Sequence, residues 1–412
     1  MKKNIFIYLG GKEICEKGAV GTHSKGIIEA VINSGFFDDY YVIGSNIDCI
    51  NNKSIHLLDI KPSKVNLKLS LYSKYINHNK QVANLYNNLE RLLLSLEAHN
   101  VTLYHRYGIF NSYPIIKKLK TNFPYLKIIL EYNDLTNEQL KFANSNKQWG
   151  FIGGFIRTNY FTQKLIEYRE KYCFTKATLN IGVTDALVDY IKLLSPKAKT
   201  LVLQNGVSEK LITKHKNKSK IELRKELKLN IDDFIIAHVG TLTYWDGLLE
   251  LIDVIAELKS ENIIVNFIIV GSGSCELKLK ELTHKLNLNN QIKFIPPLNH
   301  EEALKYIIVA DIIPLLKTIS SYQLSPMKYY EALGLGKPLI ATDIDYINSI
   351  KNSDFGIVVS NPLNNDEIKK ALIYYYKNKS KLTMLKSKII NYTLNNHTWD
   401  IRVKVILKTL NS

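Results

Sequence analysis

The chain has 412 residues, 46% hydrophobic and 23% charged, a composition typical of a globular protein with two or three domains. It contains no run of 18 apolar residues, and its apolar N-terminal stretch is too short for a signal peptide, so we expect a soluble, cytoplasmic protein. The four cysteines match no zinc-binding spacing and are expected to be reduced thiols. These are Cys15, Cys49, Cys173 and Cys275.

The net charge of +17 is unevenly distributed. Residues 1–205 contain 27 basic and 16 acidic residues, a balance of +11, whereas the rest contains 28 and 22, a balance of +6. Such an excess favours an anionic partner, which can be nucleic acid, anionic lipid or a phosphorylated substrate. The alternative is compositional drift, because Lys, Asn and Ile are all abundant, as in a chain from an AT-rich genome.

In chain order, the first half alternates short apolar runs with segments of helical spacing. A strand over 3–9 ends at two glycines and is followed by a helix over 24–34. The segment 63–98 is interpreted as a pair of surface helices or, alternatively, as a basic amphipathic helix on a membrane surface. Short apolar strands separated by helices predict a parallel sheet covered on both faces. Further strands are predicted at 40–44, 101–105, 127–132, 179–183 and 200–203.

A second series of strands follows the lysine-rich stretch 208–220, so the sequence predicts an α/β fold of two consecutive Rossmann-like units. In such sheets ligands bind beyond the carboxyl ends of the strands. The predicted strands are 234–239, 264–270, 291–295, 309–314, 338–341 and 356–359, and the helices are 247–259, 275–286, 301–308, 327–335, 365–377 and 395–411.

The segment 318–345 is the most informative part of the sequence. Ser325 and Pro326 predict a helix start, because serine caps free backbone N–H groups and proline suits the first turn. A helix N-terminus can bind a phosphate, and Lys328 adds a positive charge in its first turn. Glu331 lies three residues further along the same face, where a carboxylate can accept hydrogen bonds from ribose. The alternative is an ordinary surface pair of Lys328 and Glu331.

The pattern SPMKYYE followed by ALGLGKPLIATD resembles the donor-site signature of the family 4 (group 1) glycosyltransferases of the GT-B class. Four further segments occur in the same order as in that family. They are LQNGV at 203–207, HVGTLTYWDGL at 238–248, FIIVGSGS at 267–274 and the segment 292–316. The resemblance implies two facing Rossmann-like domains, with a C-terminal helix that crosses back to the first. We expect an acceptor domain at 1–205, a nucleotide-sugar domain at 206–390 and the returning helix at 391–412.

The resemblance also implies the residues of the donor site. Glu331 would hold the ribose, and Ser325, Pro326 and Lys328 the diphosphate. Gln323 stands where the family has a catalytic glutamate, and Thr241 and Asp246 stand where many members have arginine and lysine. The turns after the first two strands of the second unit add Gly240, Thr241, Gly271 and Gly273, although the last two glycines are equally consistent with a plain connection.

On the acceptor side, candidate residues lie at the carboxyl ends of predicted strands of the first unit. His23 and His105, together with Gln323, are the catalytic candidates, and a buried structural histidine is the alternative for the first two. Arg106 and Glu131 either bind the acceptor or pair with each other. Gly10 and Gly11 complete the predicted acceptor-binding set.

The predicted activity is therefore a retaining, metal-independent, hexosyltransferase-type transfer from a nucleotide-sugar to a hydroxyl of a glycan or polyprenyl-linked acceptor. No cofactor, metal or nucleic acid is expected. The family implies polysaccharide, lipopolysaccharide or capsule biosynthesis, and the positive first half suggests a peripheral position on the inner face of the cell membrane. The alternatives are a GT-B-fold sugar-nucleotide epimerase and a basic, non-enzymatic nucleic-acid binder.

Overall fold

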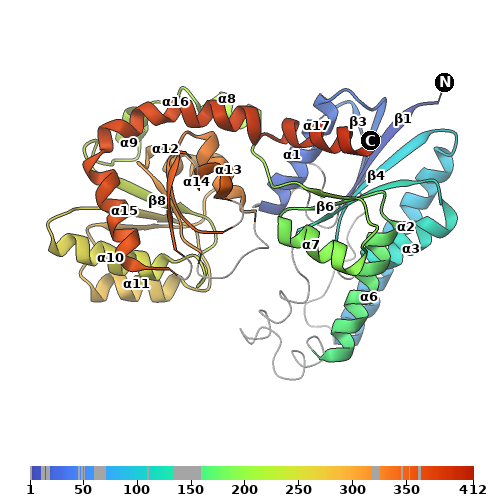
Figure 1. Cartoon of the computed structure of the whole chain (residues 1–412), viewed down its shortest axis with the longest axis horizontal. Helices are drawn as coiled ribbons and strands as arrows, with labels where there is room; N and C mark the ends of the chain where they lie inside the picture. The colour runs from blue at the N-terminus through green and yellow to red at the C-terminus, as the bar shows by residue number, and fades with distance from the viewer. Residues whose placement is uncertain are drawn as a thin grey trace. The chain divides into compact units, whose positions relative to one another are not determined.

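The computed structural model of the chain divides into two compact units (Figure 1). Unit 1 comprises Met1–Gln204 and Arg402–Ser412, and unit 2 comprises Asn205–Ile401. No helix in the described part of the chain has both the length and the apolar character needed to cross a membrane. The structure describes residues 2–10, 14, 19–44, 47, 50, 52–59, 71–108, 111–133, 159–317, 325–344, 347–351, 353–360 and 363–412.

The sheet of unit 1 has seven parallel strands within the described residues, in the order β3-β2-β1-β4-β5-β6-β7. Ile7 of β1 pairs in register with Tyr41 of β2 and Leu103 of β4. The sequence did not predict β3, because most of its side chains are not buried and the run is less apolar. The strands are β1 Asn4–Leu9, β2 Asp39–Gly44, β3 Ile55–Asp59, β4 Asn100–Arg106, β5 Lys127–Tyr132, β6 Leu179–Gly182 and β7 Thr200–Val202.

Helices pack on this sheet through apolar faces. Alternate residues of β1, such as Ile5 and Ile7, enter a core that also contains Leu89 and Leu93 of α2. The segment 63–98 thus contributes a helix that covers the sheet, as in the interpretation of an ordinary surface helix. The helices of unit 1 are α1 Ala19–Asn33, α2 Leu71–Ser95, α3 Ser112–Asn122, α6 Tyr160–Lys176 and α7 Asp185–Leu194, and α17 Trp399–Asn411 spans the boundary between the units.

Unit 2 has two parallel three-stranded sheets in its described part, β10-β9-β8 and β11-β12-β13, and a bridge between Ile236 and Ile312 joins β8 to the segment before β11. Successive residues of β8 enter cores on opposite faces, so Ile235 and Ile236 belong to different hydrophobic clusters. This is the predicted second α/β unit. The strands are β8 Ile235–Val239, β9 Asn266–Val270, β10 Ile292–Ile295, β11 Ile313–Leu315, β12 Leu339–Thr342 and β13 Gly356–Val359.

The described helices of unit 2 include four that the sequence did not predict, α8, α9, α14 and α16. The first two occupy the lysine-rich stretch 208–220 and its continuation, where the Ser208 and Ser219 side chains accept hydrogen bonds from the Leu211 and Glu222 amides. The helices are α8 Glu209–His215, α9 Lys220–Glu226, α10 Leu248–Ser260, α11 Glu276–Lys285, α12 His300–Val309, α13 Met327–Gly334, α14 Asn348–Lys351, α15 Asn365–Lys377 and α16 Lys379–Asn396.

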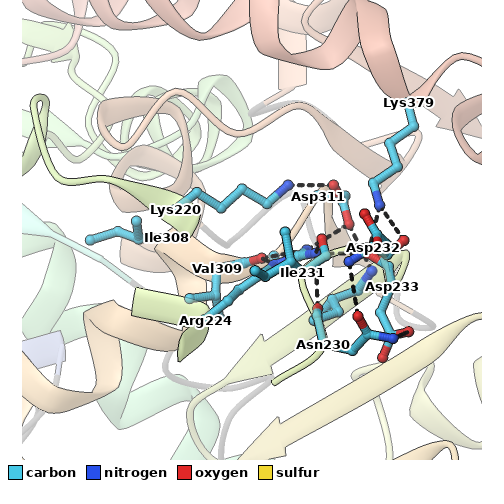
Figure 2. Close-up of polar contacts among 12 residues, drawn as sticks. Lys220, Arg224, Asn230, Ile231, Asp232, Asp233, Ile308, Val309, Asp311 and Lys379 are labelled. Carbon is cyan, nitrogen blue, oxygen red and sulfur yellow. Dashed lines mark hydrogen bonds and ion pairs between the residues drawn. The ribbon is translucent and has the colours of Figure 1, made fainter. Parts of the chain in front are cut away.

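A buried arginine links the start of unit 2 to its sheet (Figure 2). Arg224 of α9 is 1% exposed and donates hydrogen bonds to the carbonyls of Val309, Ile231 and Asp233. Its guanidinium also lies 2.9 Å from the Asp311 carboxylate, which accepts from the Ile235 amide at 2.7 Å. This network fixes the entry of β8 against the end of α12.

The chain returns to unit 1 later than predicted. Residues 391–401 belong to unit 2, because α16 places Ile389 and Ile390 in its core. The Val207 amide donates to the His397 carbonyl at 2.9 Å, and the Trp399 amide donates to the Val207 carbonyl at 3.1 Å. The first and last residues of unit 2 are thereby held side by side.

Candidate functional site

The turns after β8 and β9 lie backbone against backbone. Gly240 donates its amide to the Val270 carbonyl at 2.9 Å. A Cβ atom at Gly271 would lie 1.9 Å from the Gly240 carbonyl oxygen, and one at Gly273 would lie 2.2 Å from that of Leu242. Gly240 and Gly271 also have φ angles of +141° and +135°. This packing supports the structural interpretation of Gly271 and Gly273, and the Gly240 amide is already bonded.

Two lysines converge on one carboxylate beside the first of these turns. Lys328, in the first turn of α13, places its ammonium 3.2 Å from Oδ1 of Asp246 and 3.8 Å from where a Cβ of Gly240 would lie. Lys317, which follows β11, forms an ion pair with the same Oδ1 atom. Thr243 donates its amide and its hydroxyl to Oδ2 of Asp246 and so orients the carboxylate. We call Lys317, Asp246 and Lys328 the lysine–aspartate cluster.

Burial and charge shift the ionisation of this cluster. The pKa of Lys328 is lowered to about 8 by burial and by the neighbouring Lys317, against the opposing effect of Asp246. Burial alone would raise the pKa of Asp246, but the two lysines hold it below its ordinary value. With both lysines charged and Asp246 ionised, the cluster carries one net positive charge. It is therefore suited to an anionic ligand.

A buried histidine lies within electrostatic range of this cluster. His238 of β8 is 2% exposed, and burial followed by the charge of Lys328 lowers its pKa to about 3, so its ring is neutral at pH 7. The ring hydrogen-bonds the backbone of Thr241, whose side chain is exposed. Among the described residues, no hydrogen-bond partner lies within reach of its buried Nε2 atom.

The start of α13 differs in detail from the prediction. The helix begins at Met327, with Pro326 in the N-cap position and without a side-chain cap. The Ser325 hydroxyl instead accepts from the Asn205 amide at 2.8 Å and lies 3.0 Å from the Tyr330 hydroxyl. The prediction that Ser325 caps the helix is therefore wrong. The serine is buried and ties this helix to the beginning of unit 2.

Glu331, the predicted ribose ligand, is oriented by a histidine that the sequence did not single out. Its Oε1 atom lies 2.8 Å from Nε2 of His300, the first residue of α12. The carboxylate is mostly buried, whereas the His300 side chain is 47% exposed. An oriented carboxylate of this kind is suited to accept hydrogen bonds from a diol such as ribose.

In unit 2, the structure brings the predicted residues Lys328 and Gly240 together with Asp246 and Lys317. In the sequence, Asp246 stands out only as a departure from the family pattern, and Lys317 belongs to none of the predicted site residues. A usable signal was present, because Lys317 follows a buried strand at the edge of the sheet where ligands bind. Gln323 lies outside the described residues, as does Gly11 of unit 1.

In unit 1, the predicted residues His23 and Glu131 form a buried pair. His23 Nε2 of α1 lies 2.8 Å from Oε1 of Glu131 at the end of β5, and both side chains are under 5% exposed. The Tyr104 hydroxyl donates to the other carboxylate oxygen. Burial alone would raise the pKa of Glu131, but His23 and Arg106 lower it to about 2. Both oxygens of the Glu131 carboxylate are thus in contact with side chains of unit 1, namely His23 and Tyr104.

Three other predicted residues of unit 1 have different environments. His105 is buried, with Nδ1 3.1 Å from the Leu9 carbonyl and Nε2 2.8 Å from the Ser112 hydroxyl, which supports a structural role in place of the predicted catalytic one. Arg106 is partly exposed and forms no ion pair with Glu131 among the described residues. Gly10 is needed for packing, since a Cβ there would lie 2.6 Å from the Ile14 side chain.

Comparisons with known proteins find a family match within unit 2 and a sequence relative. Residues 219–392 match the family model for group 1 glycosyl transferases. A relative, the uncharacterized glycosyltransferase MJ1607 of Methanocaldococcus jannaschii, is 23% identical over 175 residues, which are 42% of this chain and 44% of the relative. The chain thus aligns with less than half the length of this relative.

Two solved structures are similar over nearly the whole chain. Sucrose-phosphate synthase from Thermosynechococcus elongatus has a TM-score of 0.71 at 13% identity, covering 99% of this chain and 98% of that one. Anabaena HepE in complex with UDP-glucose has a TM-score of 0.65 at 15% identity, covering 99% of both chains. Residues 219–392 thus match the group 1 glycosyl transferase family model, and the chain as a whole has the GT-B fold of these structures.

Proposed function

We propose that this protein transfers a glycosyl group from a nucleotide-sugar to a hydroxyl of a glycan or polyprenyl-linked acceptor, with retention at the anomeric carbon and without a metal ion. Unit 2 binds the donor, and unit 1 provides the acceptor side. We further propose a hexosyl donor and a role in surface polysaccharide biosynthesis, as the resemblance to family 4 suggests.

The lysine–aspartate cluster is the observation that carries this proposal. Breaking the bond between the anomeric carbon and the diphosphate leaves a nucleoside diphosphate with increased negative charge. Two preorganised ammonium groups stabilise that charge at little cost in reorganisation. Lys317 and Lys328 are held in place by Asp246, so their charges are positioned before the donor binds. Glu331, oriented by His300, then holds the ribose of the same nucleotide.

The acceptor side rests on the His23–Glu131 pair. The carboxylate of Glu131 holds the imidazole of His23 in place by its contact with the Nε2 atom of that ring. We propose that His23 positions the acceptor hydroxyl, and that Tyr104 assists by holding the carboxylate of Glu131. The similar HepE structure contains UDP-glucose, so uridine nucleotides are the first donors to test.

The decisive experiment compares UDP with uridine in titration calorimetry. Lys317→Met and Lys328→Met are each expected to weaken UDP binding about tenfold, because a charged hydrogen bond to phosphate contributes about 1.5–3 kcal/mol. Neither substitution should change uridine binding. The matched control is Lys278→Met, an exposed lysine whose ammonium lies 5.8 Å from the Tyr244 ring. UDP binding that is unchanged in both lysine variants contradicts the proposed donor site.

The epimerase alternative is separated by the product. Incubation of the nucleotide-sugar with a hydroxyl acceptor should release nucleoside diphosphate and form a glycoside, whereas an epimerase yields an isomeric nucleotide-sugar without release. If UDP and its sugar conjugates fail to bind, GDP- and CMP-linked sugars are tested next. Failure of all of them overturns the proposal.

A further inference from the structure

An unusual face of unit 1 lies on α6. Three apolar or aromatic side chains on this helix point to solvent, with Phe161 82%, Leu165 48% and Tyr168 59% exposed. Their spacing of four and three residues places them in one stripe along the helix. Large side chains exposed in a contiguous stripe usually mark an interaction site, whereas single exposed ones do not.

Basic residues flank this stripe. Lys164 and Lys171 lie along one border, three to four residues from Tyr168, and Lys176 lies on the other border near the C-terminal end. All three are exposed. The surface continues onto α3, where the Tyr113 ring contacts the Tyr168 ring at a centroid distance of 6.1 Å. Apolar side chains bordered by lysines are suited to a lipid headgroup region, because the rings can enter its apolar boundary while the ammonium groups contact anionic headgroups.

The helix is held rigidly by its opposite face. Ile166, Cys173 and Phe174 are buried in unit 1, and the buried Glu170 carboxylate accepts from the Tyr132 and Tyr190 hydroxyls at 2.7 and 2.6 Å. The Asn159 side chain caps the helix by accepting from the Thr162 amide at 2.9 Å. The exposed stripe is thus a preformed surface and does not need to fold on binding.

We propose that the stripe of Phe161, Leu165 and Tyr168, with its flanking Lys164, Lys171 and Lys176, docks unit 1 on an anionic phospholipid surface. Charge complementarity selects this occupant, since residues 1–205 carry +11 and the stripe itself is bordered by lysines. The inference deepens the proposed function, because a polyprenyl-linked acceptor would be reached from that surface. It also assigns to α6 the membrane contact that the sequence suggested for 63–98.

The test is sedimentation of the full-length protein with vesicles of phosphatidylcholine alone or with one quarter phosphatidylglycerol. Binding is expected only to the anionic vesicles. Phe161→Ser with Tyr168→Ser should reduce it at least about tenfold, because each ring buries a large apolar area. Lys164→Gln with Lys171→Gln should reduce it roughly twentyfold, at about fivefold per charge. Leu193→Ser on α7, where the side chain is 76% exposed, is the matched control and should bind as the wild type does.

UDP affinity, measured in parallel, separates this inference from the proposed function, because the α6 variants should retain it. The inference is overturned if the aromatic double variant binds anionic vesicles as well as the wild type, or if neutral vesicles bind equally. It is also overturned if the wild type is a dimer that only this variant dissociates, since the stripe would then be an interface between two copies. If the wild type binds none of the UDP, GDP and CMP conjugates but still binds anionic vesicles, the donor proposal is refuted and the docking surface stands.

Discussion

At the scale of single residues, Lys328 has the most informative environment. Its ammonium shares a carboxylate oxygen with Lys317 and lies near the neutral ring of His238. Burial and the second lysine lower its pKa from 10.5 to about 8, so its charge is lost in the mildly alkaline range where an ordinary lysine stays charged. A bound diphosphate must raise this pKa again, because an anion favours the charged form.

We therefore predict that nucleoside diphosphate affinity falls as the pH rises from 7 to 9, by up to about tenfold, as Lys328 loses its proton. Near pH 8, binding should be accompanied by proton uptake, measurable by calorimetry in buffers of different ionisation enthalpy. Lys328→Arg should bind without this decline, because arginine remains charged throughout. An identical decline in that variant would show that another group is responsible.

At the scale of elements, the glycine turns show both what the sequence predicts and what it does not. Gly240, Gly271 and Gly273 were correctly placed in turns after strands, because glycine after an apolar run is a local signal. Their close approach was not predictable, since it depends on the pairing of β8 with β9, which brings residues about thirty positions apart together. Lys317 has a local signal, because it follows a buried strand, but its contact with Asp246 was not predictable for the same reason. Its significance comes from Asp246, which is 71 residues away.

The buried network of Arg224 leads to a stability prediction at this scale. Arg224→Met should lower the free energy of unfolding by about 3–5 kcal/mol. It removes the buried guanidinium from the Asp311 carboxylate, which is then paired with the partly exposed Lys220. It also leaves the carbonyls of Val309, Ile231 and Asp233 without this donor. Urea unfolding measures this change. Lys388→Met removes an exposed ion pair with Asp354 and should have little effect. Equal destabilisation by both substitutions would mean that the buried network of Arg224 contributes no more to the free energy of unfolding than an exposed ion pair does.

At the scale of the whole molecule, the division into two units was predicted from the alternation of strands and helices, and the structure has this architecture. The predicted return at 391 was wrong by eleven residues, because α16 has little amphipathic periodicity and resembled neither core nor boundary in sequence. The polar contacts assigned to the donor all lie in unit 2. Those assigned to the acceptor and to lipid lie in unit 1.

This distribution predicts a regional effect of donor binding. Hydrogen–deuterium exchange with UDP should show slower exchange in 238–247 and 316–331, whereas β1, β4 and β5 should exchange at unchanged rates. A truncated control ligand, uridine, should protect 316–331 less, because it lacks the diphosphate that contacts the lysines. Protection confined to unit 1 would place the nucleotide in the wrong unit and contradict the assignment.

The contact between Val207 and the segment 397–399 has a practical consequence. Unit 2 is one continuous piece of chain inserted between Gln204 and Arg402, and its two ends emerge next to each other. An inserted domain with adjacent ends can be excised and produced on its own, or exchanged as a cassette for that of a relative, without rerouting the chain. If unit 2 binds the donor as proposed, such an exchange should transfer donor preference while unit 1 is kept.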